Sequence, residues 1–272
     1  MVLLYIPPVQ NLLRREVTAY ASKATGMQIQ VERIDLRFPL NLLVRGVEVI
    51  QQPDTLLSLE SLNVRVQAWP LLKGKVEVDE VTLSQVAVNS ANLIEGMQIK
   101  GVLGRFFLQS HGVDLSNETA VVNRTELSDT HIQLLMTDTT TTPKDTTASA
   151  PVNWKVNLHQ LKLKNVSFGM KLPADSMKMA AYIGEATIDD AKADLKNQFY
   201  GLKQFLLSGA SASYDTGEAQ PSEGFDASHM AVRNIRIGLD SLLYEGRNMN
   251  AVIREITMEE RSGLSITSLT GR

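Results

Sequence analysis

The chain of 272 residues contains no cysteine, which excludes a disulfide-stabilised scaffold, a thiol nucleophile and a thiolate metal site. Aromatic residues make up only 6% of the chain. No run of roughly 20 apolar residues, the length that spans a membrane, occurs in the sequence. The formal net charge is −3, whereas a domain that grips nucleic-acid phosphates is normally strongly basic. With 43% hydrophobic residues, the composition predicts a mostly ordered protein that does not bind nucleic acid.

Sequence motifs of common enzyme classes are also missing. There is no G-x-S-x-G, no G-x-x-x-x-G-K-[ST] and no H-E-x-x-H. The acidic pairs Asp189-Asp190 and Glu259-Glu260 are adjacent residues, which on a strand point to opposite faces and do not converge on one substrate. The four histidines are far apart in the sequence: His111, His131, His159 and His229. We therefore expect no enzyme activity, no catalytic residue, no metal site and no cofactor, and we expect His131 and His159 on outward-facing strand positions.

One helix is predicted near the start of the chain, opened by Pro7-Pro8 and ended by Gly26. Between them, apolar residues recur at helical spacing: Val9, Leu12, Leu13, Val17, Tyr20, Ala21 and Ala24. Such a face usually covers one end of a core and less often lies on a membrane surface. The residues before the helix resemble the last turn of a shortened hydrophobic segment, so we expect them to be membrane-proximal. They are Leu3, Leu4, Tyr5 and Ile6.

After Gly26 the helical spacing gives way to strand-like alternation. Ile29 and Val31 alternate with polar residues, and the alternation resumes at Ile34 after a slip of one residue. A β-bulge or a tight corner leaves a slip of this kind. The same spacing begins again at residues 59, 78, 158, 232 and 253, with a weaker copy at 183.

Many further segments alternate like strands. They are residues 43–50, 86–91, 97–108, 118–124, 130–136, 166–172, 177–183, 191–195, 202–214, 240–246 and 265–269. Short alternating strands with polar turns predict an antiparallel sheet. A helix over residues 197–208 is the alternative there, although Gly201 and the lack of a good cap argue against it.

The threonine-rich residues 137–149 contain no apolar side chain larger than Ala, which predicts a disordered loop over 137–150. Since alternation resumes at residue 152, the loop is predicted to interrupt one sheet rather than to separate two domains. The predicted organisation is therefore a membrane-proximal tail and helix (1–26), a first sheet region (27–136), the loop (137–150) and a second sheet region (151–272).

An alternating sheet has two uses for its apolar side. The side can pack on another sheet as a sandwich core, or the sheet can stay curled and open as a groove. An open apolar groove is costly in water unless an apolar ligand fills it, and acyl chains are a natural ligand. Periodicity alone leaves both alternatives open and favours the sandwich.

Several segments resemble the N-terminal region of the TamB family, the translocation and assembly module subunits within the AsmA-like group. They are residues 4–10 before the helix, 29–40, 54–57, WPLLKGKV at 69–76, 224–226, His229, 234–241, 246–251 and 260–264. The threonine-rich insert is similar to that of Bacteroidetes-type members. The resemblance covers nearly the whole chain, and its motifs are structural rather than catalytic.

The resemblance implies a fold and a function. The expected fold is mainly β, an elongated and curled antiparallel sheet with one N-terminal amphipathic helix. The expected function is that of the inner-membrane-proximal segment of a periplasmic protein that passes phospholipids and serves outer-membrane biogenesis. Such a protein is anchored in the inner membrane and works with an outer-membrane barrel of the BamA/TamA class, through a C-terminal domain that this sequence lacks.

On this view, inward positions of the strands contact phospholipid acyl chains. The expected groove residues are Ile29, Val31, Ile34, Leu36, Val64, Val66, Val81 and Leu83. Two other functions stay open. One is a scaffold for outer-membrane protein assembly and secretion, whose exposed sheet edges bind partner strands. The other is a hydrolase without a recognisable motif.

Overall fold

The structure is a computed structural model. It describes residues 7–51, 53–67, 69, 77–90, 93, 96–114, 117–136, 153–173, 176–217, 229–245, 250–259 and 265–271. The predicted tail residues Leu3, Leu4, Tyr5 and Ile6 and the predicted loop at 137–150 lie outside the described residues.

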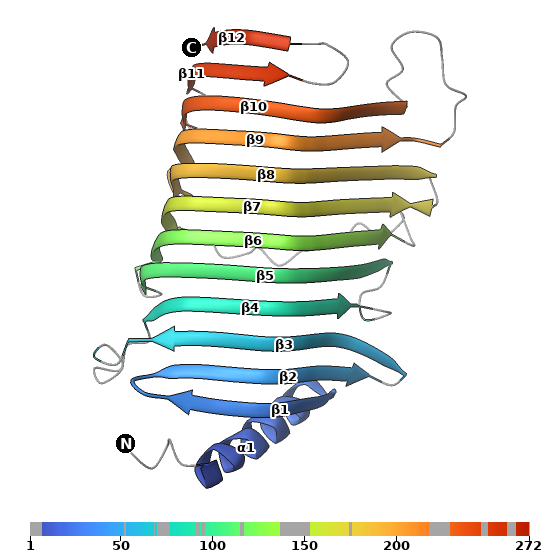
Figure 1. Cartoon of the computed structure of the whole chain (residues 1–272), viewed down its shortest axis with the longest axis vertical. Coiled ribbons are helices and arrows are strands. Elements are labelled where there is room, and N and C mark those ends of the chain that lie inside the picture. Colours follow the sequence, from blue (N-terminus) through green and yellow to red (C-terminus); the bar gives the residue numbers. More distant parts are fainter. Residues whose placement is uncertain are drawn as a thin grey trace.

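The described residues form one helix and one sheet of twelve strands (Figure 1). The helix is α1 (Pro7–Thr25). The strands are β1 (Gln28–Arg37), β2 (Asn41–Gln51), β3 (Asp54–Val66), β4 (Val78–Asn89), β5 (Met97–Asp114), β6 (Thr119–Met136), β7 (Lys155–Leu172), β8 (Met177–Asp194), β9 (Phe199–Asp215), β10 (His229–Glu245), β11 (Asn250–Glu259) and β12 (Ser265–Gly271). Their order in the sheet follows the sequence, so β1 and β12 are its two edges. The prediction of a mainly β, elongated and curled sheet with one N-terminal helix is confirmed.

One strand pair departs from the predicted antiparallel arrangement. β6 and β7 run parallel, with Leu127 opposite Leu163, whereas every other neighbouring pair in the described sheet is antiparallel. Parallel neighbours need a connection of about a dozen residues or more, because the chain must return to the end where the first strand began. Residues 137–154 connect β6 to β7, which is long enough for this return. The sheet is therefore mixed.

The strands are longer than predicted. Segments expected as separate short strands at 118–124 and 130–136 are both parts of β6, which has 18 residues, and 177–183 and 191–195 are both parts of β8. The prediction was wrong because a break in alternation was interpreted as a strand end, whereas the strand continues through it. The region that could have been a helix is the strand β9, as its alternation favoured.

A row of bends crosses the sheet at these breaks, and we call it the seam. It consists of Glu32, Gly46, Glu60, Gln85, Gly104, Asp129, Asn165, Gly184 and Gly209, which lie opposite one another in β1 to β9. Five of them have left-handed backbone conformations, with φ between 50° and 62°: Gly46, Gln85, Asp129, Asn165 and Gly209. Left-handed residues are mostly Gly, Asn and Asp, as four of these five are. The predicted bulge or corner at Glu32 is thus one end of a bend shared by neighbouring strands.

At two positions of the seam, the neighbouring strand lies so close that only glycine leaves enough space. A Cβ atom on Gly104 would lie 2.7 Å from the Cβ atom of Asp129. A Cβ atom on Gly46 would lie 2.6 Å from the Glu32 carboxylate. Both distances are shorter than van der Waals contact, so the seam is closely packed on its own backbone.

Helix α1 lies along the edge strand β1 (Figure 1). Gln10 Nε2 donates a hydrogen bond to the carbonyl of Leu36 at 2.9 Å, and Arg14 Nη1 donates one to the carbonyl of Glu32 at 2.7 Å. An uncovered edge strand offers its main-chain groups to other chains. Side chains of α1 therefore occupy hydrogen-bonding groups that would otherwise be free at this edge.

Polar side chains of the helix contact the sheet, and two of its large apolar side chains are exposed. Ser22 Oγ accepts a hydrogen bond from the amide of Ile29 at 3.0 Å. In contrast, Leu12 is 55% exposed and Tyr20 is 77% exposed. The helix ends as predicted, since Gly26 has a φ of 69° and donates to the carbonyl of Ser22.

Candidate ligand-binding face

Apolar side chains line up across the sheet in rows that run from strand to strand. The central row consists of Ile34, Val44, Leu62, Leu83, Phe106, Leu127, Leu163, Ala186, Leu207 and Ile237. Each member lies directly opposite the next one, in strands β1 to β10. Residues directly opposite each other in neighbouring strands project from the same face of the sheet. The central row is therefore a continuous apolar band along the long axis of the molecule.

Two more rows extend this band. The second row consists of Leu36, Leu42, Val64, Val81, Leu108, Thr125, Leu161, Ile188, Phe205 and Leu239. The third row, beyond the seam, consists of Val31, Val47, Leu59, Val86, Leu103, Thr130, Val166 and Ile183. In each strand the central and third rows are three residues apart, because the seam shifts the alternation by one residue. We call the three rows together the apolar face.

The eight predicted groove residues lie on or beside this face. The central row includes Ile34 and Leu83, and the second row brings together Leu36, Val64 and Val81. These five residues belong to β1, β3 and β4. In the sheet, β2 lies between β1 and β3, and β3 is next to β4.

The other three predicted groove residues lie at greater distance from the central row. Val31 begins the third row, and Ile29 is one step beyond it, opposite Val49. Val66 lies at the end of β3, opposite Val78, after a register shift. Seven of the eight are half-buried, and only Ile34 is buried.

The prediction was confined to the first four strands, and most of the apolar face lies further along. Phe106, Leu127, Leu163 and Leu207 continue the central row in β5, β6, β7 and β9. The signal that identifies them is the same three-residue step, for example from Leu103 to Phe106. Alternation does not show which residue of one strand lies opposite which residue of the next. The register across the parallel pair β6–β7 could therefore not be predicted from the sequence.

The apolar face lacks a second layer among the described residues. In the described part of the chain, the buried hydrophobic residues are Ile34, Leu56, Ala120, Val122, Ala186 and Ala210, and no large side chain there is fully buried. Outside the three rows, Ile132 is 40% exposed and Phe168 is 42% exposed, although they lie directly opposite each other. In a two-layer sandwich such central strand residues would be covered.

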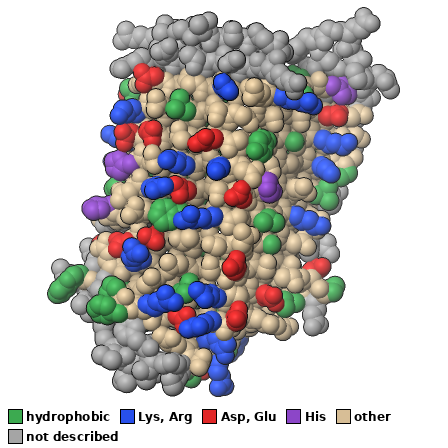
Figure 2. All heavy atoms as spheres, viewed as in Figure 1, with side chains coloured by type: hydrophobic (Ala, Val, Ile, Leu, Met, Phe, Trp, Pro, Cys, Tyr) green, Lys and Arg blue, Asp and Glu red, His purple; other side chains and the backbone are tan. Residues whose placement is uncertain are grey.

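The opposite face is mainly polar, although Val102 (46% exposed) and Leu206 (47% exposed) lie on it. Its row beside the seam consists of Arg33, Arg45, Ser61, Ser84, Arg105, Ser128, Lys164, Glu185 and Ser208. Figure 2 shows a face on which Lys, Arg, Asp and Glu side chains are spread over the strands. Cross-strand ion pairs join Arg65 to Glu80 and Lys155 to Asp194, both at 3.3 Å. The sheet is therefore amphipathic across its thickness.

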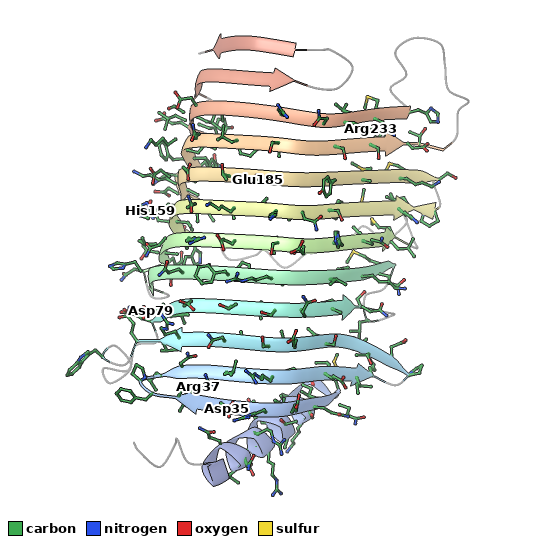
Figure 3. All side chains as sticks on the ribbon, viewed as in Figure 1. Asp35, Arg37, Asp79, His159, Glu185 and Arg233 are labelled. Atoms are coloured by element: carbon green, nitrogen blue, oxygen red, sulfur yellow. The ribbon has the colours of Figure 1, made fainter. Side chains whose placement is uncertain are left out.

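Two carboxylates on exposed parts of the sheet have perturbed acidity. The hydrogen bond with His159, whose Nδ1 lies 3.0 Å from Asp190 Oδ1, lowers the pKa of Asp190, and Lys203 assists (Figure 3 labels His159). The pKa of Asp194 is lowered by the Asn197 main-chain amide, which donates at 3.0 Å, and by the Asn197 side chain. In both cases the partners belong to strand pairing or to a turn.

The histidines expected on strand surfaces are exposed there. His131 Nδ1 lies 2.7 Å from Ser167 Oγ, and His159 contacts Asp190 as described. Within the described ranges, no group of three or more His, Asp or Glu residues has the geometry of a metal site. The apolar face extends over most strands of the sheet. Its side chains can bind an apolar ligand by removing the apolar surface of that ligand from water.

In the described part of the chain, the helix α1 does not combine the length and apolarity that crossing a membrane requires. No protein-family model matches the chain, and no curated protein matches it.

Proposed function

We propose that this protein holds lipid acyl chains on its apolar face. The observation that carries the proposal is the combination of three continuous apolar rows with no covering layer among the described residues. Contiguous exposed apolar patches larger than a few hundred Å² are rare on soluble monomers and mark interaction sites. A ligand without hydrogen-bonding groups suits rows made almost entirely of Val, Leu, Ile and Phe.

The direction of the rows favours a long, narrow ligand. Neighbouring strands lie about 4.8 Å apart, so a row that crosses ten strands extends for about 40 Å. A chain laid along the rows would contact Leu62, Leu83 and their neighbours in turn. Each methylene removed from water contributes about 0.8 kcal/mol. This gain offsets the cost of keeping an apolar face open.

On this proposal, the chain acts in phospholipid transfer between membranes. The resemblance to the TamB family supports the further proposal that it is an inner-membrane-proximal segment of a periplasmic bridge. Phospholipid would then pass toward an outer-membrane barrel of the BamA/TamA class. The scaffold alternative relies on free sheet edges, and its support is weaker at β1, because Gln10 and Arg14 of α1 already occupy main-chain groups there.

The test is native mass spectrometry of the purified protein, followed by lipid extraction. We expect bound phospholipid at a reproducible stoichiometry. The matched variants are Val64→Asp/Val81→Asp on the apolar face and Ser61→Asp/Ser84→Asp on the polar face. Each variant places two carboxylates directly opposite each other on the same two strands, β3 and β4.

On an open face, Val64→Asp/Val81→Asp should remain folded by circular dichroism and lose the lipid, while the serine variant keeps it. If the valine variant unfolds and the serine variant does not, the valines are part of a closed core, since a buried unpaired carboxylate is costly. That result, or a wild-type protein free of lipid, would overturn the proposal. Capture of unfolded outer-membrane proteins by lipid-free protein would favour the scaffold.

A further inference from the structure

A depression with a volume of about 710 Å³ lies over the ends of β5 to β10. Four small residues lie opposite one another along it: Gly169, Ala180, Ser213 and Ala231. A row of small side chains between rows of longer ones leaves a trough in the surface of a sheet. Val166 of the third row belongs to the apolar face, and Gly169 lies three residues further along the same strand. Because successive residues alternate, this row is on the face opposite the apolar face.

Basic side chains flank the trough. Lys171 of β7 and Lys178 of β8 lie directly opposite each other, and both line the depression. Lys100 of β5 lines it too, opposite Gln133, which in turn lies opposite Gly169. Figure 2 shows Lys and Arg side chains along the right margin of the charged face.

The three lysines carry charges that the described protein groups do not neutralise. All three are exposed, and no ion pair of the described residues includes Lys100, Lys171 or Lys178. Like charges directly opposite each other across two strands destabilise a sheet. The pair Lys171 and Lys178 is therefore an unfavourable arrangement that a bound anion would relieve.

Among the described residues, one acidic group lines the trough, and it already has partners. Asp215 lies opposite Lys178 in the register, yet its Oδ1 accepts a hydrogen bond from the amide of Gly217 at 2.8 Å. The same oxygen lies 3.5 Å from Nε2 of His229. Of the described groups that line the trough, the three lysines thus outnumber the one carboxylate, and these groups together carry a positive charge although the chain is acidic overall.

We propose that this trough is a binding site for an anionic group, a phosphate or a carboxylate. Lys171 and Lys178 hold the anion from one side and Lys100 from the other. Gln133 and Ser213 supply neutral hydrogen-bond donors along the trough. Ammonium groups bind such anions through charge-assisted hydrogen bonds, which are stronger than neutral ones. The site goes beyond the proposed acyl-chain function, since it lies on the other face of the sheet and depends on none of the apolar rows.

Such an anion has two sources, a soluble phosphate compound or the headgroup of an anionic lipid. Titration with sodium pyrophosphate, followed by two-dimensional NMR of the amides, tests the first source. Flotation with vesicles of phosphatidylcholine, with or without an equal part of phosphatidylglycerol, tests the second. We expect saturable binding in at least one of these experiments, with amide shifts concentrated near residues 100, 133, 169–171, 178–180 and 213 if pyrophosphate binds.

Two variants test the site by different means. Lys171→Gln/Lys178→Gln removes two of the three lysine charges and should weaken binding about tenfold or more, at least the effect of losing one hydrogen bond to a charged group. Gly169→Leu keeps every charge and fills the trough. A Cβ atom there meets nothing closer than 3.9 Å, so the backbone tolerates a side chain, and binding should fall by a similar factor.

The control is Lys162→Gln/Lys164→Gln, which removes two charges from the same strand, β7, away from the depression. It should bind as the wild type does. Equal loss in the control and in Lys171→Gln/Lys178→Gln would show a diffuse charge effect and overturn the proposal. Absence of binding to both probes, or full binding by Gly169→Leu, would overturn it too. Loss of lipid from the apolar face would not affect this result, so the two proposals fail separately.

Discussion

Asp129 of β6 and Asn165 of β7 lie opposite each other in the parallel strand pair, and both have a φ of 53°. The Asn165 side-chain amide donates a hydrogen bond to the Asp129 carboxylate at 2.7 Å. Both residue types tolerate the left-handed conformation better than most. The pair therefore continues the seam across the point where the strand direction changes from antiparallel to parallel.

Asn165→Val should destabilise the protein by about 2 kcal/mol or more, because a left-handed backbone costs an L-residue about 1–2 kcal/mol and the hydrogen bond to Asp129 is lost as well. Asn165→Gly loses the same hydrogen bond without the steric cost, and should lie within about 1 kcal/mol of the wild type. Urea unfolding followed by circular dichroism measures both. Equal effects of the two substitutions would show that backbone conformation at the seam contributes little.

Gly104→Ala should destabilise the protein by about 1–3 kcal/mol, because the new methyl group would overlap the Cβ atom of Asp129 at 2.7 Å and its carbonyl oxygen at 3.0 Å. The matched control is Gly169→Ala, whose nearest contact would be 3.9 Å away. We expect the control to change the free energy of unfolding by no more than about 0.5 kcal/mol. Thermal unfolding of both variants under the same conditions decides the comparison.

Gln10→Ala/Arg14→Ala should promote self-association, because it frees main-chain carbonyls at the edge of β1 that α1 now occupies. Sedimentation velocity over a range of concentrations measures this. The control Asn11→Ala/Arg15→Ala removes side chains from exposed positions of the same helix. A monomeric Gln10→Ala/Arg14→Ala variant would contradict the edge-covering role of the helix.

The carboxyl group of Asp194 should titrate below its ordinary pKa of 3.8, because the amides of Asn197 and then Lys155 stabilise its charged form. A folded-state pKa below the unfolded value means that the contribution to stability is present above pH 3.8 and is lost as the pH falls below it. Carbon-detected NMR of the side-chain carboxyl gives the midpoint directly. Asn197→Gly removes only the side-chain donor and keeps the main-chain amide, so it should raise that midpoint part of the way toward the ordinary value. An unchanged midpoint would contradict the role of the Asn197 side chain.

Much of the fold follows from local spacing in the sequence. The alternation that starts at Ile29 predicts a strand because only a period of two places every apolar residue on one face. The slip at Glu32 predicts a bend because an intact strand cannot shift phase. Gly26 after an apolar helical stretch predicts the end of α1. These features depend on residues close together in the chain, so the sequence contains them.

The candidate binding face was predictable only in part. In the first strand, alternation assigned Ile29, Val31, Ile34 and Leu36 to the inward side. The rows that join Leu83 to Phe106 and Leu127 to Leu163 could not, because register depends on how long loops return the chain to the sheet. The trough between Lys100 and Lys171 was not predicted, since these residues are brought together by strands far apart in the sequence.

By itself, the sequence determined that most of the chain forms strands, that the first strand bends at Glu32 and that apolar and polar residues alternate along each strand, because each arises from spacing of a few residues. The other bends were interpreted from the sequence as strand ends. Only the tertiary structure decided that β6 and β7 run parallel and that α1 occupies the β1 edge with polar side chains. It also decided that no second sheet in the described chain covers the apolar rows. Alternation makes one face apolar whether that face is buried or open, and which of the two occurs depends on contacts between distant segments.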